Sequence, residues 1–272
     1  MVLRYVFYCY NLCPMTTRLL LLLLYLTISG CAFFTEATDP AEGWTVERLY
    51  IEAKRARDES NYTRAVELYE FLETRFPFGV YGQQALLDLA YVYYKTGDHE
   101  SALSTADRFI RLYPQNNFVD YAYYLQGLVN FNRHYRVTDR VFPTDESQRD
   151  VSSARSAFQN FSELLVRFPN SIYAQDSSQR MVYLRNILAQ YEIHVAEYYL
   201  RRKAYVAAVT RAKKVVENFG KTPSVPDALV VLAKAYRILA LNDLSNDALR
   251  VLELNYPDHP GIADTKRIVL NQ

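Results

Sequence analysis

Cysteine is nearly absent from this chain, and its placement is the first constraint on what the protein can be. The 272 residues contain three cysteines, Cys9, Cys13 and Cys31, and none follows position 31. A folded part that begins after Cys31 therefore has no disulfide to stabilise it. It also has no thiol that could act as a nucleophile.

Glycine, proline and net charge are also low. The chain has 8 glycines and 10 prolines, which is typical of an all-α protein with short turns. Its formal net charge is +1, so no strong overall field favours nucleic acid as a partner. Apolar residues make up 50% of the chain, enough for one extended domain or two compact ones.

Residues that carry out chemistry are scattered. None of the four histidines has a histidine or cysteine partner at metal-ligand spacing, so we expect no metal site. No glycine-rich phosphate loop follows a strand, and we expect no cofactor. Asp88 and Asp98 lie on or beside one predicted helix, where paired acids are usually solvated. The sequence therefore predicts no catalytic residue and no enzymatic activity.

The stretch 75–114 has the pattern of a helical hairpin. Apolar residues first recur with helical spacing at Leu86, Leu89, Ala90 and Tyr93. Gly97 then interrupts the pattern, because glycine supplies the backbone freedom that a tight turn needs. A second apolar stripe follows at Ala102, Ala106, Phe109, Ile110 and Tyr113, and Pro114 ends it. This spacing resembles the tetratricopeptide repeat.

The hairpin recurs along the chain. Small residues suited to a close helix crossing repeat every 37 residues, at Ala53, Ala90 and Gly127 and again at Ala196 and Ala233. One hairpin cannot bury its own apolar face, so neighbouring hairpins are expected to stack. We therefore predict an all-α, right-handed solenoid of about five tetratricopeptide-like hairpins, near residues 44–77, 81–114, 118–169, 173–220 and 224–257.

Two repeats depart from this pattern. The third has an insertion between its helices, roughly His134 to Asp150, and a long loop in a repeat array is usually functional or disordered. The fourth has no glycine or proline from Tyr173 to Arg202, which predicts one long helix joining two halves of the solenoid. Residues 262–270 predict a short closing helix, so the repeat domain is expected to span 44–272.

The N-terminus has the features of an export signal. An apolar run, Leu19–Ile28, follows Arg18 and is too short to span a bilayer, which needs about 20 residues. Ser29-Gly30-Cys31 then ends the segment as a bacterial lipobox does, with small residues before the cysteine. We predict a lipoprotein signal peptide over residues 1–30. Residues 1–14 fit a signal poorly, which favours translation starting at Met15, with Met1 as the alternative start.

Cys31 is the predicted lipidation site and the new N-terminus after cleavage. Several acyl chains on one residue would hold the protein stably on a membrane, and Ala32 after the cysteine favours the outer membrane. The alternative is a leftover cysteine beside an ordinary signal. Residues 31–43 lack periodicity and predict a lipid-anchored linker to the repeat domain.

Four longer stretches can be compared with known families: RFPFGVYGQQALLDLAYVYYK, DRFIRLYP, ARSAFQNFSELLVRFPNSIYAQDSSQRMVYLRNILAQYE and VAEYYLRRKAYVAAV. They resemble the BamD-type lipoproteins of the outer-membrane β-barrel assembly machinery, a tetratricopeptide-repeat family. The resemblance covers essentially everything after Cys31, including the insertion and the long helix. Two departures are local: Val80 replaces a common proline, and residues 142–150 lack a glycine that is often present.

The resemblance implies a five-repeat scaffold, lipid-anchored on the periplasmic face of the outer membrane. Its implied partners are the periplasmic POTRA domains of a BamA-type barrel protein, other lipoproteins of the complex, and unfolded outer-membrane proteins. Its implied role is to bind those precursors and the barrel component, and so to promote folding and insertion. The repeats alone leave two alternatives: a periplasmic lipoprotein adaptor for cell-wall or division machinery, and a structural spacer.

The candidate precursor-binding groove is at the turn and first helix of repeat two. Barrel precursors end in short segments of alternating apolar and aromatic residues, which a concave groove with aromatic walls and amide groups can hold extended. The candidate residues are Phe78, Tyr81, Gln84, Asp88 and Tyr91. The alternative is that Tyr91 belongs to the core and Phe78 packs a turn, so Gln84 beside Tyr81 is the favoured pair.

The candidate docking surface for the barrel component is in repeat four, where bases are dense. Its residues are Arg201, Arg202, Arg211 and Lys214. Arg211 follows an apolar run, 206–209, so its stem can lie along the helix while its planar fork reaches a partner carboxylate. The alternative is a solvated basic face, which is the favoured interpretation for the neighbouring Lys213.

Overall fold

The computed structural model describes residues 41, 43–134 and 150–270, which form eleven α-helices and no strand. The repeat unit begins at Thr45. The helices of the first three repeats are α3 (Val46–Asp58), α4 (Tyr62–Arg75), α5 (Gly79–Thr96), α6 (His99–Leu112), α7 (Val119–His134) and α8 (Ser152–Arg167). The helices of the remainder are α9 (Ala174–Arg201), α10 (Tyr205–Asn218), α11 (Val225–Ile238), α12 (Asn242–Asn255) and α13 (Gly261–Leu270).

The predicted hairpin of repeat two is confirmed as α5 and α6. Gly97 ends α5 in the left-handed conformation, with φ of 80°, which a residue with a Cβ atom rarely adopts. Asp98 then caps α6, since its side chain accepts a hydrogen bond from the backbone N–H of Ser101. Ala90 and Ala102 are completely buried in one cluster, so the two helices approach closely at small residues.

Small residues have the same role in the other repeats. The predicted crossing residues Ala53, Ala196 and Ala233 have no exposed surface. The same holds for the alanines on the second helices of their hairpins and of repeat three, which are Ala65, Ala157 and Ala208. Gly127 is the tightest position, because a Cβ atom there would overlap the ring of buried Phe161. In repeat five the second small residue is Ser245, whose hydroxyl donates to the carbonyl of Ala233 at 2.8 Å.

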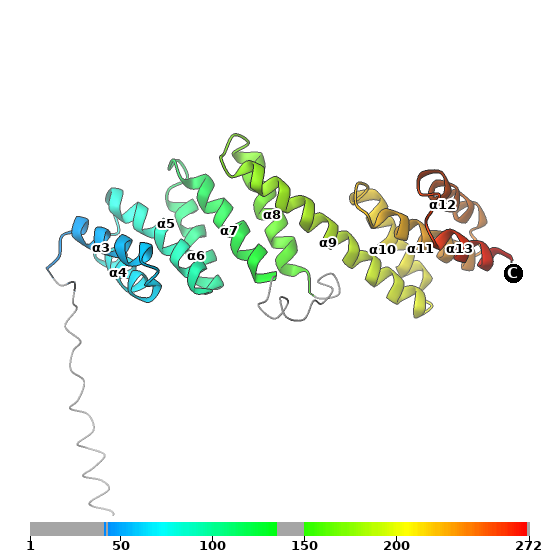
Figure 1. Cartoon of the computed structure of the whole chain (residues 1–272), viewed down its shortest axis with the longest axis horizontal. Coiled ribbons are helices and arrows are strands. Elements are labelled where there is room, and N and C mark those ends of the chain that lie inside the picture. Colours follow the sequence, from blue (N-terminus) through cyan, green and yellow to red (C-terminus); the bar gives the residue numbers. More distant parts are fainter. Residues whose placement is uncertain (1–40, 42, 135–149, 271–272) are drawn as a thin grey trace, which may run out of the picture. The chain divides into compact units, whose positions relative to one another are not determined.

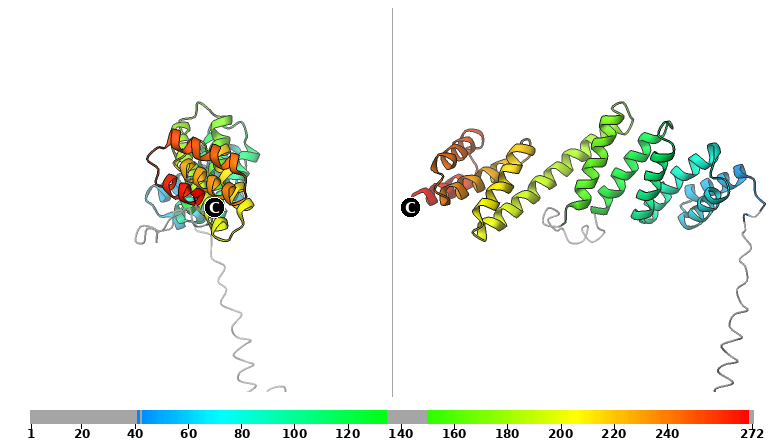
Figure 2. Two further views of the ribbon diagram at one scale, coloured as in Figure 1. Left: turned by 90° about the vertical axis from the view of Figure 1, so that its right-hand side faces the viewer. Right: turned by 180° about the vertical axis from the view of Figure 1, so that it is seen from behind.

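Each helix of the repeat unit packs against the helices before and after it in the chain (Figure 1). The first helices of neighbouring repeats also meet, α3 with α5, α5 with α7, and α9 with α11. Helix α9 belongs to both halves. Its first part places Leu184 and Leu188 in the cluster that α8 supplies, and its second part places Ile193 in the cluster of α10 and α11. Figure 2 shows this long helix from behind.

The predicted fold class is therefore confirmed: helical hairpins in series, with one long helix in the fourth. The closing helix is α13. The signal peptide, Cys31, most of the linker and residues 135–149 of the insertion lie outside the described residues. Among the helices that the structure describes, none is long and apolar enough to cross a membrane.

Candidate polypeptide-binding sites

Four of the five predicted groove residues lie on one face of α5. Tyr81, Gln84, Asp88 and Tyr91 are spaced by 3, 4 and 3 residues, which aligns them along a helix. The fifth, Phe78, precedes α5, and its side chain is 86% exposed. Phe78 therefore does not pack the turn.

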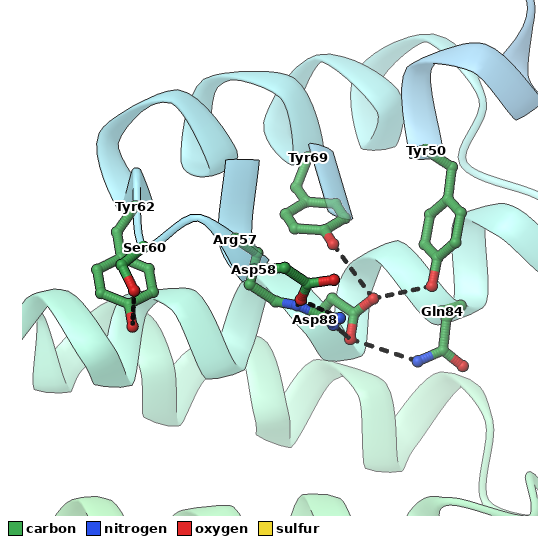
Figure 3. A network of polar contacts seen from close by, with 8 residues as sticks. All are labelled: Tyr50, Arg57, Asp58, Ser60, Tyr62, Tyr69, Gln84 and Asp88. Atoms are coloured by element: carbon green, nitrogen blue, oxygen red, sulfur yellow. Dashed lines mark hydrogen bonds and ion pairs between the residues drawn. The ribbon is translucent and has the colours of Figure 1, made fainter. Parts of the chain in front are cut away.

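Asp88 is the centre of a polar network between the first two repeats (Figure 3). Its side chain is buried and accepts from four side chains on three helices. Arg57 and Gln84 donate to Oδ1 at 2.8 and 3.4 Å. The hydroxyls of Tyr50 and Tyr69 donate to Oδ2 at 3.0 and 3.3 Å. The expectation that Asp88 is a solvated surface acid is therefore wrong.

The groups of this network influence one another's pKa values. Burial raises the pKa of Asp88, and the Arg57 guanidinium and the hydrogen bonds from Tyr50, Gln84 and Tyr69 oppose that rise. Burial and the nearby Asp88 carboxylate raise the pKa of both phenols, so Tyr50 and Tyr69 remain hydrogen-bond donors. Because each partner comes from a different part of α3, α4 and α5, the network fixes how these helices pack.

An open pocket of about 550 Å³ lies beside this network. It is lined by Arg57, Asp58, Ser60, Tyr62, Asp88, Tyr91 and Tyr121. Tyrosine rings give such a pocket apolar walls, and their hydroxyls and the charged groups give it hydrogen-bonding capacity. The pocket therefore offers both apolar contact surface and hydrogen-bonding groups.

Tyr91 and Tyr81 take part in packing as well as lining this face. Tyr91 is half-buried against the cluster around Ala90 and also borders the pocket, so it is partly a core residue, and its role in precursor binding stays a prediction. The Tyr81 ring lies 5.4 Å from that of Tyr50, centre to centre. Gln84 donates to Asp88 through its amide nitrogen, which leaves its carbonyl oxygen available as an acceptor.

Sequence reasoning missed the partners of Asp88 on other helices. Tyr50, Arg57 and Tyr69 lie 38, 31 and 19 residues away along the chain. None of these separations matches the repeat period, so no pattern links them to Asp88. Tyr121 was also missed, although it follows Gln84 by one repeat of 37 residues, and that spacing was a usable signal.

The predicted docking residues lie on the end of α9 and on α10, and two of them share an internal partner. Arg211 donates to Oε2 of Glu192 at 2.9 Å, and Lys214 donates to Oε1 at 2.5 Å. Only 1% of the Glu192 side chain is exposed, against 38% of Arg211 and 36% of Lys214. The expected free fork of Arg211 is therefore already engaged within the chain.

The Glu192 cluster keeps an excess positive charge. Burial would raise the pKa of Glu192, but the hydrogen bonds from Lys214 and Arg211 outweigh it and hold this pKa below its usual value. One carboxylate thus faces two half-exposed cations. Arg201 and Arg202 are exposed at the end of α9, and Arg201 is 3.7 Å from Glu197.

A second open pocket, of about 510 Å³, lies along the second part of α9. Its lining includes Tyr191, Val195, Tyr198 and Tyr199, with Arg201 at its end. Tyr198 is 51% exposed, so its ring is open to contact from outside. Of the four predicted docking residues, Arg201 lines this pocket.

Among the described residues, no group of histidine, cysteine, aspartate or glutamate side chains could hold a metal ion. A model of the YfiO family, described as outer membrane lipoprotein, matches residues 43–252. A protein of Neisseria gonorrhoeae named outer membrane protein assembly factor BamD is 45% identical over 245 residues, covering 89% of this chain and 92% of that protein. The chain belongs to the BamD family.

BamD proteins of other bacteria match over similar spans. The BamD of Xylella fastidiosa strain Temecula1 is 39% identical over 253 residues, covering 93% of this chain and 86% of the relative. That of Vibrio cholerae is 36% identical over 208 residues, covering 76% and 86%. Membership in the BamD family of assembly factors agrees with a scaffold that is not an enzyme.

Proposed function

We propose that this BamD-family chain is an outer-membrane scaffold that holds unfolded barrel precursors on its N-terminal repeats. On its C-terminal half it docks to the periplasmic POTRA domains of a BamA-type barrel protein. The observation that carries the proposal is the face of α5, where Tyr81, Gln84 and Tyr91 stand in line beside an open, tyrosine-lined pocket. An extended segment with alternating aromatic residues fits this arrangement of ring faces and hydrogen-bonding groups.

The binding face is preformed, which lowers the cost of holding a flexible ligand. The Asp88 network ties α3, α4 and α5 together beneath it, so the groove side chains are held before a precursor arrives. Preorganisation of this kind raises affinity without a demand for one exact sequence. Such a site suits a scaffold that receives many different barrel precursors.

The experiment that tests the groove measures binding of a fluorescent peptide from the C-terminus of a barrel protein. Tyr81→Ala combined with Gln84→Ala should weaken binding by about tenfold, or about 1.4 kcal/mol, as expected for an aromatic anchor. Gln159→Ala, on the exposed side of α8, is the matched control. Unchanged affinity of the double variant, with an unchanged thermal melt, would show that this face does not bind precursors.

The proposed anchor is lipid on Cys31. The Cys31→Ala variant should remain unprocessed or be recovered in the soluble periplasmic fraction, because a single acylated residue is the proposed hold on the membrane. Fractionation of cells followed by immunoblotting measures this. Recovery of Cys31→Ala in the outer membrane at the wild-type level would contradict the proposal.

The proposed docking surface combines Arg201, Arg202, Arg211 and Lys214 with the aromatic pocket on α9. Substitutions of Arg201 and Arg202 test this surface with little effect on stability, since both side chains are exposed at the helix end. The double change Arg201→Glu with Arg202→Glu should lower co-purification with the barrel component, most strongly at low salt. Co-purification at the wild-type level would place docking elsewhere. In the same eluates of the double variant, the amounts of the other lipoproteins of the complex should fall together with the amount of the barrel component.

A further inference from the structure

In the N-terminal half of the repeat unit, from α3 to the start of α9, the most exposed apolar side chains gather at three places. Phe78 is 86% exposed, Ile172 84%, Val80 80% and Val166 78%. Leu112 and Phe118 follow at 58% and 54%. All six lie in or next to the turns that join one repeat to the next, between α4 and α5, α6 and α7, and α8 and α9.

These three turns lie on one edge of the repeat unit. Successive helices joined by short turns run in opposite directions, so every turn between repeats falls at the same end of the hairpins (Figure 1). We name this edge, formed by residues 76–80, 112–118 and 166–172, the inter-repeat edge. The start of α3, at Val46, falls on the same edge, because α3 runs in the direction of α5 and α7.

The opposite edge of the first two repeats is polar. Its turns within the first two repeats consist of Glu59-Ser60-Asn61 and Thr96-Gly97-Asp98, all exposed. The turn between α10 and α11 continues the inter-repeat edge into the C-terminal half without a large exposed apolar residue. In the first two repeats, exposed apolar side chains thus distinguish the inter-repeat edge from the opposite one. In the C-terminal half, the strongly exposed Val206 (67%) and Leu254 (75%) lie at the start of α10 and the end of α12.

Each of the three turns also carries an arginine near its start: Arg75, Arg111 and Arg167. The Arg75 guanidinium lies over the rings of Phe71 and Phe76. Arg111 pairs with Asp107, and Arg167 pairs with Glu163 at 2.8 Å, both within their own helices. All three arginines are exposed, so their guanidinium groups can also reach an anionic surface beyond the turn.

We propose that the inter-repeat edge rests on the lipid bilayer, with its apolar side chains among the headgroups and its arginines beside lipid phosphates. An open pocket of about 420 Å³ lies between the second and third turns, lined by residues that include Asn116, Asp120 and Asn170. The six exposed apolar side chains are not part of its lining, and apolar residues at successive tips suit a broad fluid surface. Aromatic and aliphatic residues flanked by arginine are the composition of interfacial membrane contacts. The linker favours the same surface, since it would join the proposed lipidated Cys31 to the edge where α3 begins.

This inference rests on the proposed lipid anchor, and it adds which face of the protein contacts the membrane. The helices of the first repeats would stand roughly upright on the membrane, with the polar edge away from it. The two ends of α5 then differ in depth. Val80 and Thr96 are 16 residues apart on one helix, or about 24 Å at 1.5 Å per residue.

Tryptophan quenching tests the proposal on the full lipidated protein in vesicles of phosphatidylcholine and phosphatidylglycerol with brominated acyl chains. The only natural tryptophan is removed by Trp44→Phe, and one is then placed at Val80→Trp or, as the matched control, at Thr96→Trp. Both sites are exposed, so neither change disturbs the core. We expect several-fold stronger quenching at Val80→Trp, and Ile172→Trp should behave in the same way.

Each outcome separates this proposal from the others. Protein that floats with the vesicles but shows equal quenching at both ends of α5 would overturn the membrane-facing edge and leave the anchor standing. Protein that does not float at all would overturn both. An emission change at Val80→Trp that appears with a barrel peptide, and not with brominated lipid, would assign the edge to a polypeptide partner. Loss of quenching in vesicles without phosphatidylglycerol would support the role of the arginines.

Discussion

Arg211→Glu would turn one of the two cations around the buried Glu192 into a second carboxylate. The wild-type contact is a hydrogen-bonded ion pair at 2.9 Å to a side chain that is 1% exposed. Removing a partner from a buried ion pair costs about 3–5 kcal/mol of the free energy of unfolding. Because 38% of Arg211 is exposed and Lys214 still holds Glu192, we expect about 3 kcal/mol, at the low end of that range.

The neutral change separates the loss of a hydrogen bond from the effect of repulsion. Arg211→Gln leaves Glu192 paired with Lys214, so we expect a cost of about 1–2 kcal/mol. For a repeat unit of this size, 3 kcal/mol corresponds to a fall of roughly 6–12 °C in Tm. Thermal melts followed by circular dichroism measure both variants. The double change Arg211→Glu with Glu192→Gln should recover much of the loss.

A melt of Arg211→Glu that matches wild type would refute this reasoning, since it would show that the Glu192 cluster is not tightly coupled in solution. The result also decides how the docking surface can be probed. If Arg211→Glu is destabilised as expected, lost co-purification in that variant reports unfolding as well as docking. Arg211→Gln and the exposed Arg201 are then the appropriate variants.

Three further predictions concern stability. Folding lowers the pKa of Glu192, so the ionised carboxylate stabilises the folded state fully above the ordinary pKa of 4.5. This stabilisation is lost as the pH falls through the lowered pKa of the folded state. The Tm of the wild type should therefore drop below about pH 4.5, and the Tm of Glu192→Gln should drop less. Gly127→Ala should cost about 1–3 kcal/mol in denaturant melts, because its Cβ would overlap the Phe161 ring, and an unchanged midpoint would contradict this packing. Asp88→Asn should speed hydrogen exchange in α3, α4 and α5 and cost about 1–3 kcal/mol, whereas wild-type exchange would show that the network is dispensable.

Much of the fold could be predicted from the sequence because each repeat requires particular residue types at fixed positions. Ala53, Ala90 and Gly127 mark close helix crossings at a fixed interval, and Gly97 marks a turn with positive φ. Such signals depend on backbone geometry at one position and so are visible without knowledge of distant partners. The long helix α9 was predictable for the same reason, since nothing in its sequence interrupts it.

The polar contacts could not be predicted in this way. Asp88 and Glu192 occupy helix positions that also suit solvated acids, and only the packed structure shows that they are buried. Apart from Gln84, their partners come from other helices at separations unrelated to the repeat period. The density of basic residues near Arg211 was visible in the sequence. The orientation of the Arg211 side chain was not, and in the structure it donates to Glu192 within the chain. Periodicity thus predicts burial of apolar residues better than the pairing of charges.

Site-specific photocrosslinking tests the central claim most directly. A photoreactive amino acid at Tyr91, on the pocket face of α5, should crosslink to newly exported barrel precursors in living cells. The same group at Glu70, exposed on α4, serves as the control. The account predicts precursor adducts at position 91 and few at position 70. Equal adducts at both positions, or none at 91 in a protein that still supports barrel assembly, would contradict it.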